Sequence, residues 1–285
     1  MLKLARFFTV FFAILSFSLI SCKEEEGETY PYAMGDIVLS DGSLVHFADR
    51  TSITEEQKKK AIGVVFYVYY SGYTDEITNY IKTSSDPKVK NIKALALGLK
   101  HQRLTSWARE YTTGYKTNFS DISDSSLKVG ITAWEKVYSL LKDSKLTRDD
   151  YVYASEDYNQ EQPLYKNEWK ISKEGNGRFE ETNYPAFYFA NTYGVKNSLN
   201  SLSFAGDFHL PALEEFKMIS DNINIVQPSL ECTSAGFSLA SLGRFWTANQ
   251  SSTAVNADVY NFSSMRSDSA SKSVETQVVA AFVLY

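Results

Sequence analysis

The sequence predicts an α+β fold in which an antiparallel sheet packs against two or more short helices. Residues 36–47 have the pattern of a β-hairpin, and residues 64–70 that of a central strand. Residues 133–141 and 211–219 place apolar side chains at helical spacing. Further strand patterns close the chain. Because strands and helices occur in separate runs and do not alternate, the pattern indicates α+β and not α/β.

The first elements follow from their turn and capping residues. The dipeptide 41–42 (Asp-Gly) joins two apolar runs, and its glycine can adopt the positive φ that a type I′ turn requires. Residues 54–57 (TEEQ) fit a capping box that opens a short helix, and Gly63 is expected to close it. The β-branched and aromatic run 64–70 (VVFYVYY) then predicts a buried strand.

The middle of the chain is less regular. Residues 94–115 show a mixed pattern of apolar and polar residues, and buried side chains are expected at Leu95, Leu97, Leu99 and Trp107. Residues 143–183 are polar and hydroxyl-rich, which predicts a long excursion with little core. Residues 185–193 and 211–219 each begin with proline, which is tolerated at the start of a helix.

The C-terminal part predicts an antiparallel meander. Its strand candidates are residues 243–249, 259–262 and 277–285, separated by turns rich in Ser, Asn and Asp. Since the chain ends inside the last strand, a C-terminal truncation should remove part of the core.

Composition excludes several classes of protein. The chain has 285 residues, of which 44% are hydrophobic, with 14 Gly, 6 Pro and 2 Cys. This apolar content supports a core and excludes a disordered chain. The formal net charge is −5 without an offsetting basic stripe, so nucleic acid is not an expected partner. Two cysteines cannot build a disulfide scaffold.

The N-terminus has the pattern of a secretory signal. Lys3 and Arg6 precede an apolar run of 14 residues, 7–20, which is too short to span a bilayer comfortably. Residues 19–22 (LISC) resemble a bacterial lipobox, which implies that residues 1–21 are removed and that Cys22 is lipidated. Two or three acyl chains anchor a protein stably to a membrane.

Residues 22–34 are expected to form the lipid anchor and a tether. The run 23–26 (KEEE) resembles the surface-export signal of some outer-membrane lipoproteins. That resemblance implies a lipid-anchored protein of the outer membrane that faces outside. A charged run is also typical of a plain solvated tether. The alternative is therefore an envelope protein that faces the periplasm.

A series of short motifs occurs along the chain, at residues 63–68, 96–100, 105–108, 184–187, 206–215, 245–250 and 279–282. This series resembles bacterial lipoproteins with an Lcl C-terminal-like domain, also called the major paralogous domain. The resemblance implies one C-type lectin-like domain over residues 35–285, related to formylglycine-generating enzymes. The family carries arginine on its last strand near the positions of Val278 and Ala280, so a role of that strand in binding anions is in doubt.

No catalytic or metal-binding pattern is present. His46, His101 and His209 are far apart in the sequence, so no zinc site is expected. Residues 227–229 (QPS) resemble the lectin Gln-Pro-Asp motif without its acid, and no calcium site or other cofactor is expected. Cys232 is expected to be a half-buried small hydrophobic residue. We therefore expect a protein that is not an enzyme.

The strongest candidate for a binding surface is the stretch 244–263, which mixes aromatic, amide and charged side chains. Such groups can stack on a sugar or donate hydrogen bonds to a partner. The candidate ligand residues are Arg244, Trp246, Asn249, Gln250, Asn256, Asp258 and Tyr260. The stretch is equally typical of a half-buried strand with ordinary turns.

Together these observations predict a surface binding or adhesion module for a glycan or an extracellular host or matrix protein. Two alternatives remain: a structural envelope lipoprotein without a specific ligand, and a degenerate relative of the formylglycine-generating enzymes.

Overall fold

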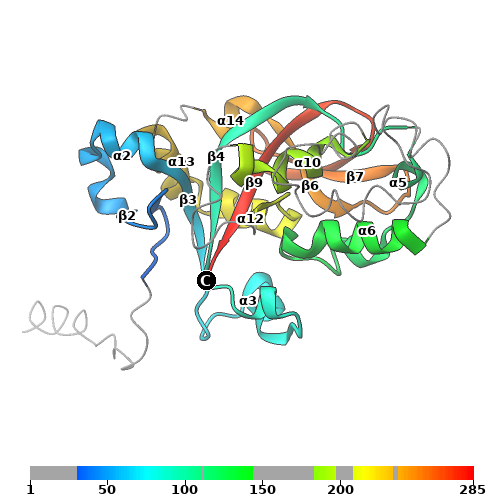
Figure 1. Ribbon diagram of the computed structural model, residues 1–285, viewed down its shortest axis with the longest axis horizontal. Helices are drawn as coiled ribbons and strands as arrows, with labels where there is room; N and C mark the ends of the chain where they lie inside the picture. Colours follow the sequence, from blue (N-terminus) through cyan, green and yellow to red (C-terminus); the bar gives the residue numbers. More distant parts are fainter. Residues whose placement is uncertain (1–30, 111, 144–182, 197–207, 234–236) are drawn as a thin grey trace, which may run out of the picture. The chain divides into compact units, whose positions relative to one another are not determined.

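The computed structural model describes residues 31–110, 112–143, 183–196, 208–233 and 237–285 (Figure 1). Residues Tyr32–Tyr285 belong to one structural unit. The predicted signal segment, Cys22 and residues 144–182 of the predicted excursion lie outside the described residues. Among the residues described, no helix combines the length and apolarity needed to cross a bilayer.

A mixed sheet forms the centre of the fold. Within the described residues it has nine strands: β1 (Ile37–Leu39), β2 (Leu44–Val45), β3 (Ala61–Val68), β4 (Ala94–Thr105), β5 (Phe208–His209), β6 (Arg244–Gln250), β7 (Asn256–Asn261), β8 (Arg266–Ser271) and β9 (Thr276–Leu284). Their order is β2-β1-β3-β4-β9-β6-β7-β8, with β5 paired to β9. This confirms the predicted α+β class with a sheet.

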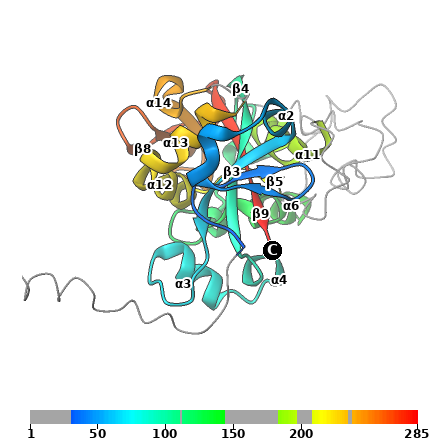
Figure 2. The same cartoon turned by 90° about the vertical axis from the view of Figure 1, so that its left-hand side faces the viewer.

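Short helices cover both faces of the sheet. They are α2 (Glu55–Lys60), α3 (Glu76–Thr83), α4 (Pro87–Lys90), α5 (Thr113–Lys116), α6 (Ala133–Asp143), α10 (Pro185–Asn191), α11 (Tyr193–Lys196), α12 (Leu213–Asp221), α13 (Ile223–Cys232) and α14 (Leu239–Leu242). The described ranges also contain the 3₁₀ helices η2 (Phe47–Ser52), η3 (Ser120–Ile122) and η4 (Gly130–Thr132). In Figure 2, α12 and α13 lie on one side of β3, β4 and β9, and α6 and α11 on the other.

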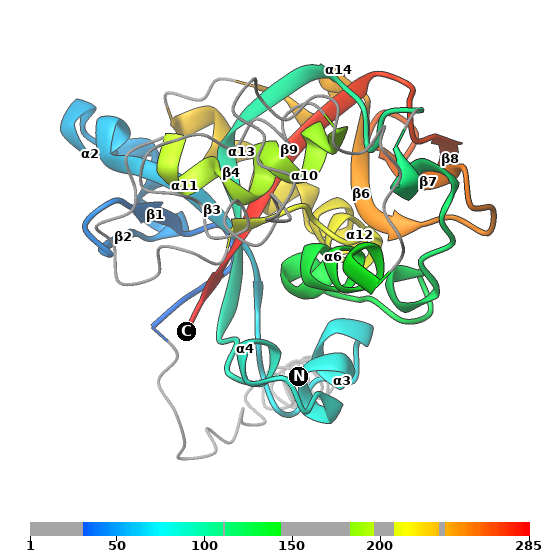
Figure 3. The same cartoon turned by 45° about the vertical axis from the view of Figure 1, so that its right-hand side comes forward.

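The core has two layers because β9 is buried on both faces. Val278, Ala280 and Phe282 pack in one layer with residues of α6 and α10, whereas Val279 and Ala281 pack in the other with residues of α3, α12 and α13. This alternation follows from the two-residue period of a strand. Figure 3 shows β9 passing between these groups of helices.

The N-terminal hairpin is confirmed, but its turn differs from the predicted type. β1 and β2 pair antiparallel, with Ile37 opposite Val45. Gly42 has φ of +84°, and Asp41 is not among the residues with positive φ. A two-residue type I′ turn needs positive φ at both central residues. The connection between β1 and β2 is therefore longer than a two-residue turn. It is closed by the Gly42 amide, which donates to the Leu39 carbonyl at 2.9 Å.

The capping box is also confirmed, whereas the predicted role of Gly63 is wrong. Thr54 accepts from the Gln57 amide, and the Gln57 side chain accepts from the Thr54 amide. The helix ends at Lys60, and Gly63 lies inside β3. A Cβ at Gly63 would overlap the Phe282 ring, so the glycine allows the ring to approach the backbone.

Three strands, β4, β5 and β8, were not predicted from the sequence. Residues 94–105 form the long strand β4, in which Leu95, Leu97 and Leu99 are buried as expected. The edge strand β8 (RSDSAS) has no apolar pattern because its side chains are exposed or half-buried. β8 is held in the sheet by its antiparallel pairing with β7.

The predicted antiparallel meander is only partly right. β6, β7 and β8 form one, but β9 lies on the other side of β6 and pairs parallel to it, with Phe245 opposite Gln277. β9 also pairs antiparallel with β4. The last strand therefore lies in the middle of the sheet.

A fully buried lysine stabilises the turn between β8 and β9. The Lys272 Nζ donates to the carbonyls of Gly114 at 2.9 Å and Thr117 at 3.1 Å. It lies 4.7 Å from the Trp107 ring centroid and 4.9 Å from that of Phe119. Burial lowers the pKa of Lys272 to about 7.

Replacing Lys272 with Met should therefore change the pH dependence of stability. Between pH 7 and 10 the unfolded chain binds a proton on Lys272 that the native chain lacks. The free energy of unfolding of the parent should rise with pH in this window, by up to about 1.4 kcal/mol per pH unit. Lys272→Met lacks this contribution, whereas Lys59→Met, at an exposed position, should follow the parent. Urea unfolding at pH 7, 8.5 and 10 measures the difference, and parallel profiles for parent and Lys272→Met would contradict it.

Candidate functional site

The seven predicted ligand residues lie on β6 and β7 but in different environments. Four are buried: Trp246, Asn249, Gln250 and Tyr260. Arg244 is exposed, and Asn256 and Asp258 are half-buried. The structure therefore does not bring the seven together on one binding surface.

Trp246 belongs to the core. Its Nε1 donates to the Thr105 carbonyl at 2.6 Å, and the Trp107 Nε1 donates to the Thr247 carbonyl at 3.0 Å. These two bonds join the chain around the end of β4 to β6. The expectation that Trp246 offers a face to a ligand is corrected, because its ring is fully buried.

The two buried amides hold backbone groups. Asn249 Oδ1 accepts from the Leu213 amide at 2.6 Å, and its Nδ2 donates to the Leu127 carbonyl at 3.0 Å. Gln250 Nε2 donates to the carbonyls of Thr253 and Asn256. Asn249 was expected at the end of a strand, with its amide available to a ligand. It lies in β6, and its loss would leave a buried donor and a buried acceptor without partners.

Two of the three predicted residues on β7, Asp258 and Tyr260, also have structural neighbours. The Tyr260 ring is stacked on Phe216, with centroids 6.0 Å apart and planes inclined by 22°. Burial raises the pKa of the Asp258 carboxyl to about 6, and the nearby Asp124 carboxylate adds to this, whereas Lys217 opposes it. Neither side chain lines the pocket described below.

A buried carboxylate organises the start of α12. Glu215 accepts from the amides of Gly130 at 2.8 Å and Ala212 at 2.6 Å, and its Oε1 lies 2.8 Å from His209 Nε2. Through these three contacts Glu215 joins η4, β5 and the start of α12. Sequence reasoning missed Glu215, although its position three residues after the helix entry is a capping signal.

No metal centre is formed by the described residues, in which no group of three His, Cys, Asp or Glu side chains could hold an ion. The QPS motif lies in α13, where Ser229 is buried and donates to the Gly35 carbonyl at 2.6 Å. Cys232 is a half-buried free thiol, as expected.

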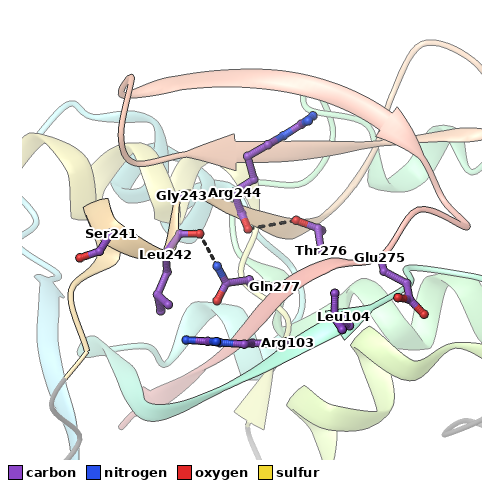
Figure 4. Close-up of a pocket in the computed structure, with 9 residues that line it drawn as sticks. All are labelled: Arg103, Leu104, Ser241, Leu242, Gly243, Arg244, Glu275, Thr276 and Gln277. Atoms are coloured by element: carbon purple, nitrogen blue, oxygen red, sulfur yellow. Dashed lines mark hydrogen bonds between the residues drawn. The ribbon is translucent and has the colours of Figure 1, made fainter.

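An open pocket of about 560 Å³ lies in this region. It lies where the end of β4 meets the starts of β6 and β9 and the end of α14 (Figure 4). Its lining consists of Arg103, Leu104, Ser241, Leu242, Gly243, Arg244, Glu275, Thr276 and Gln277. Arg244 is the predicted ligand residue that contributes to it.

Two internal hydrogen bonds shape the pocket. Thr276 Oγ1 donates to the Arg244 carbonyl at 3.1 Å, and Gln277 Nε2 donates to the Leu242 carbonyl. In Figure 4 the Arg103 side chain extends toward Leu242 and away from Glu275, whereas the Arg244 guanidinium points away from Arg103. These contacts join β9 to the segment that enters β6.

A bulge in β4 forms one edge of the pocket. Gln102 is opposite Val278 and Thr105 is opposite Thr276, so β4 has one extra residue. Leu104 lies in this bulge with φ of +52° and a side chain that is 70% exposed. A branched residue rarely adopts this backbone conformation, and the strain costs on the order of 1 kcal/mol. Bulges of this kind redirect side chains at binding sites.

The sequence contained one weak signal of this pocket. The polar run 100–103 (KHQR) directly follows the buried part of β4, which indicates a strand leaving the core. Neither the bulge nor the position of β9 beside Arg103 is visible in that pattern, so Arg103 and Leu104 were missed.

The structure is similar to the crystal structure of a fimbrial protein from Bacteroides ovatus ATCC 8483, with a TM-score of 0.50 and 15% sequence identity. The match covers 89% of this chain and 49% of the fimbrial chain, so this chain spans about half the length of that protein. No family model and no curated protein matches the sequence. At this identity the similarity concerns the fold alone.

Proposed function

We propose that this chain is a lipid-anchored binding module of the bacterial outer membrane, facing outside, with a C-type lectin-like fold. The anchor rests on the lipobox-like residues 19–22, and the outward orientation on the run 23–26. The name of the structural neighbour, a fimbrial protein, is compatible with a surface location. In this proposal the chain binds a ligand and does not act as an enzyme.

The lectin-like fold is supported by where the motifs of the resemblance lie. Residues 245–250 belong to β6 and residues 279–282 to β9, and these strands are neighbours in the sheet. Residues 96–100 lie in β4, the other neighbour of β9. Motifs that are far apart in the sequence thus form one continuous part of the core.

The observation that carries the binding function is the open pocket beside Arg103 and Arg244. A concave pocket of about 560 Å³ is in the range of ligand sites in proteins. A glycan unit or a protruding protein side chain are both compatible with it. A strained, exposed residue on its edge fits a binding site better than a purely structural surface.

Blocking the pocket tests this proposal. Ser241 is exposed and lines the pocket, so Ser241→Trp should fill it without disturbing the core. We expect the purified full-length chain to bind at least one component of a glycan and matrix-protein array, and Ser241→Trp to reduce that binding at least tenfold. Ser252→Trp is the matched control, because Ser252 is exposed at the other end of β6.

A parent chain that binds no array component would favour the structural envelope lipoprotein. Equal loss of binding in Ser241→Trp and Ser252→Trp would show that the ligand does not occupy the pocket.

A further inference from the structure

Arg103 is the cation of this pocket that has no ionic partner within the described part of the chain. Arg103 is exposed and forms no ion pair with any of the residues that the structure describes. Its guanidinium extends across the pocket toward Leu242 and Ser241 (Figure 4). A guanidinium has five donors in a planar arrangement that suits the two oxygens of a carboxylate.

The other charges of the pocket have partners elsewhere. Arg244 Nη2 lies 3.2 Å from Asp268 Oδ2 on β8, and Glu275 Oε1 lies 4.0 Å from Arg109 Nη1. Neither pair includes Arg103. The local cation is notable because the whole chain carries a formal charge of −5. A ligand with a single negative charge can therefore contact Arg103 without competing for the ion pairs of Arg244 and Glu275.

The remaining lining favours a peptide over a sugar. Leu104 and Leu242 supply apolar surface, and Val274, next to Glu275, is 48% exposed. None of the nine lining residues is aromatic, so the pocket offers no ring on which a sugar could stack. The two aromatic candidates on β6 and β7, Trp246 and Tyr260, are buried. Apolar surface beside the Arg103 guanidinium complements an apolar residue next to a carboxylate.

We propose that the pocket receives a carboxylate of a protein partner on Arg103, with a neighbouring apolar side chain of that partner against Leu104. This inference rests on the proposed binding function and narrows its ligand to a protein. The carboxylate comes from an acidic side chain or from the C-terminus of the partner.

Short capped peptides distinguish these sources. The probes are acetyl-Leu-Glu-amide, its neutral counterpart acetyl-Leu-Gln-amide, acetyl-leucine with a free carboxylate, and glucuronic acid. Each is titrated into the full-length chain, and the Arg103 Nε–Hε NMR signal, assigned by its loss in Arg103→Gln, is followed. We expect millimolar binding of one or both peptidic carboxylates and at least tenfold weaker binding of the amide. Preference between the two acids identifies the side-chain or the terminal carboxylate.

Matched variants separate a specific site from general charge. Arg103→Gln should weaken binding at least tenfold, judged by the Leu104 methyl signals, and Arg103→Lys should retain part of it. Arg266→Gln removes the same charge from an exposed position outside the pocket and should change affinity less than twofold. Thermal unfolding should be the same in all three variants.

Three results would overturn the inference. These are equal binding of acetyl-Leu-Glu-amide and acetyl-Leu-Gln-amide, equal weakening by Arg103→Gln and Arg266→Gln, or a response to glucuronic acid alone, which would make the ligand an acidic glycan. If the array identifies a ligand that Arg103→Gln binds as tightly as the parent, the proposed function stands and this inference fails.

Discussion

Deleting residues 276–285 is expected to leave the chain unfolded. β9 lies between β4 and β6 and also pairs with β5, so its removal divides the sheet. All residues from Val278 to Leu284 are buried, and their burial contributes on the order of 10 kcal/mol. That is comparable to the whole stability of a typical domain, about 5–15 kcal/mol.

Circular dichroism and urea unfolding of the purified variant measure this effect. Deletion of Tyr285 alone is the control, because this residue is 43% exposed and lies after β9. A cooperative unfolding transition in the chain that lacks residues 276–285 would contradict the central role of β9.

Glu215→Ala should have the largest effect of the single substitutions considered. The side chain is fully buried, and its loss leaves the amides of Gly130 and Ala212 and the His209 ring without their acceptor. Breaking such a buried charged network costs about 3–5 kcal/mol. Urea unfolding at pH 7 measures the loss.

The adjacent Glu214 is a matched control. It is part-exposed and contacts Lys217 at 2.9 Å, one turn along the same helix. Such pairs contribute about 0–1 kcal/mol, so Glu214→Ala should stay within about 1 kcal/mol of the parent. A Glu215→Ala variant with a similarly small loss would show that Glu215 is not needed at this junction.

Local signals were sufficient for the elements that carry their own pattern. The capping box at Thr54, the helix that buries Leu213, Phe216 and Ile219, and the N-terminal hairpin are all present. In each case the decisive residues are within about four positions of one another, so their spacing alone reports the contact. β8 lacked such a signal because it is stabilised by backbone pairing with β7 and not by the burial of its own side chains.

The candidate site could be located only in part from the sequence. The stretch 244–263 was correctly associated with strands, and Arg244 does line the pocket. However, composition cannot distinguish the two faces of a strand that is covered on both sides. Trp246, Asn249 and Tyr260 were therefore interpreted as ligand contacts, although helices and neighbouring strands bury them.

Local patterns predicted the α+β class, the strands β1, β2, β3, β6, β7 and β9, the helices α2, α6, α10 and α12, and an N-terminal lipid anchor, because these depend on residues close together in the chain. The tertiary structure decided that β9 inserts beside β6, that Glu215 and Asn249 hold distant backbone groups, and that Arg103 faces a pocket beside Leu242 and Gln277. These features join residues more than 30 positions apart. Their pairing depends on how the sheet is ordered, which no local pattern of residues specifies.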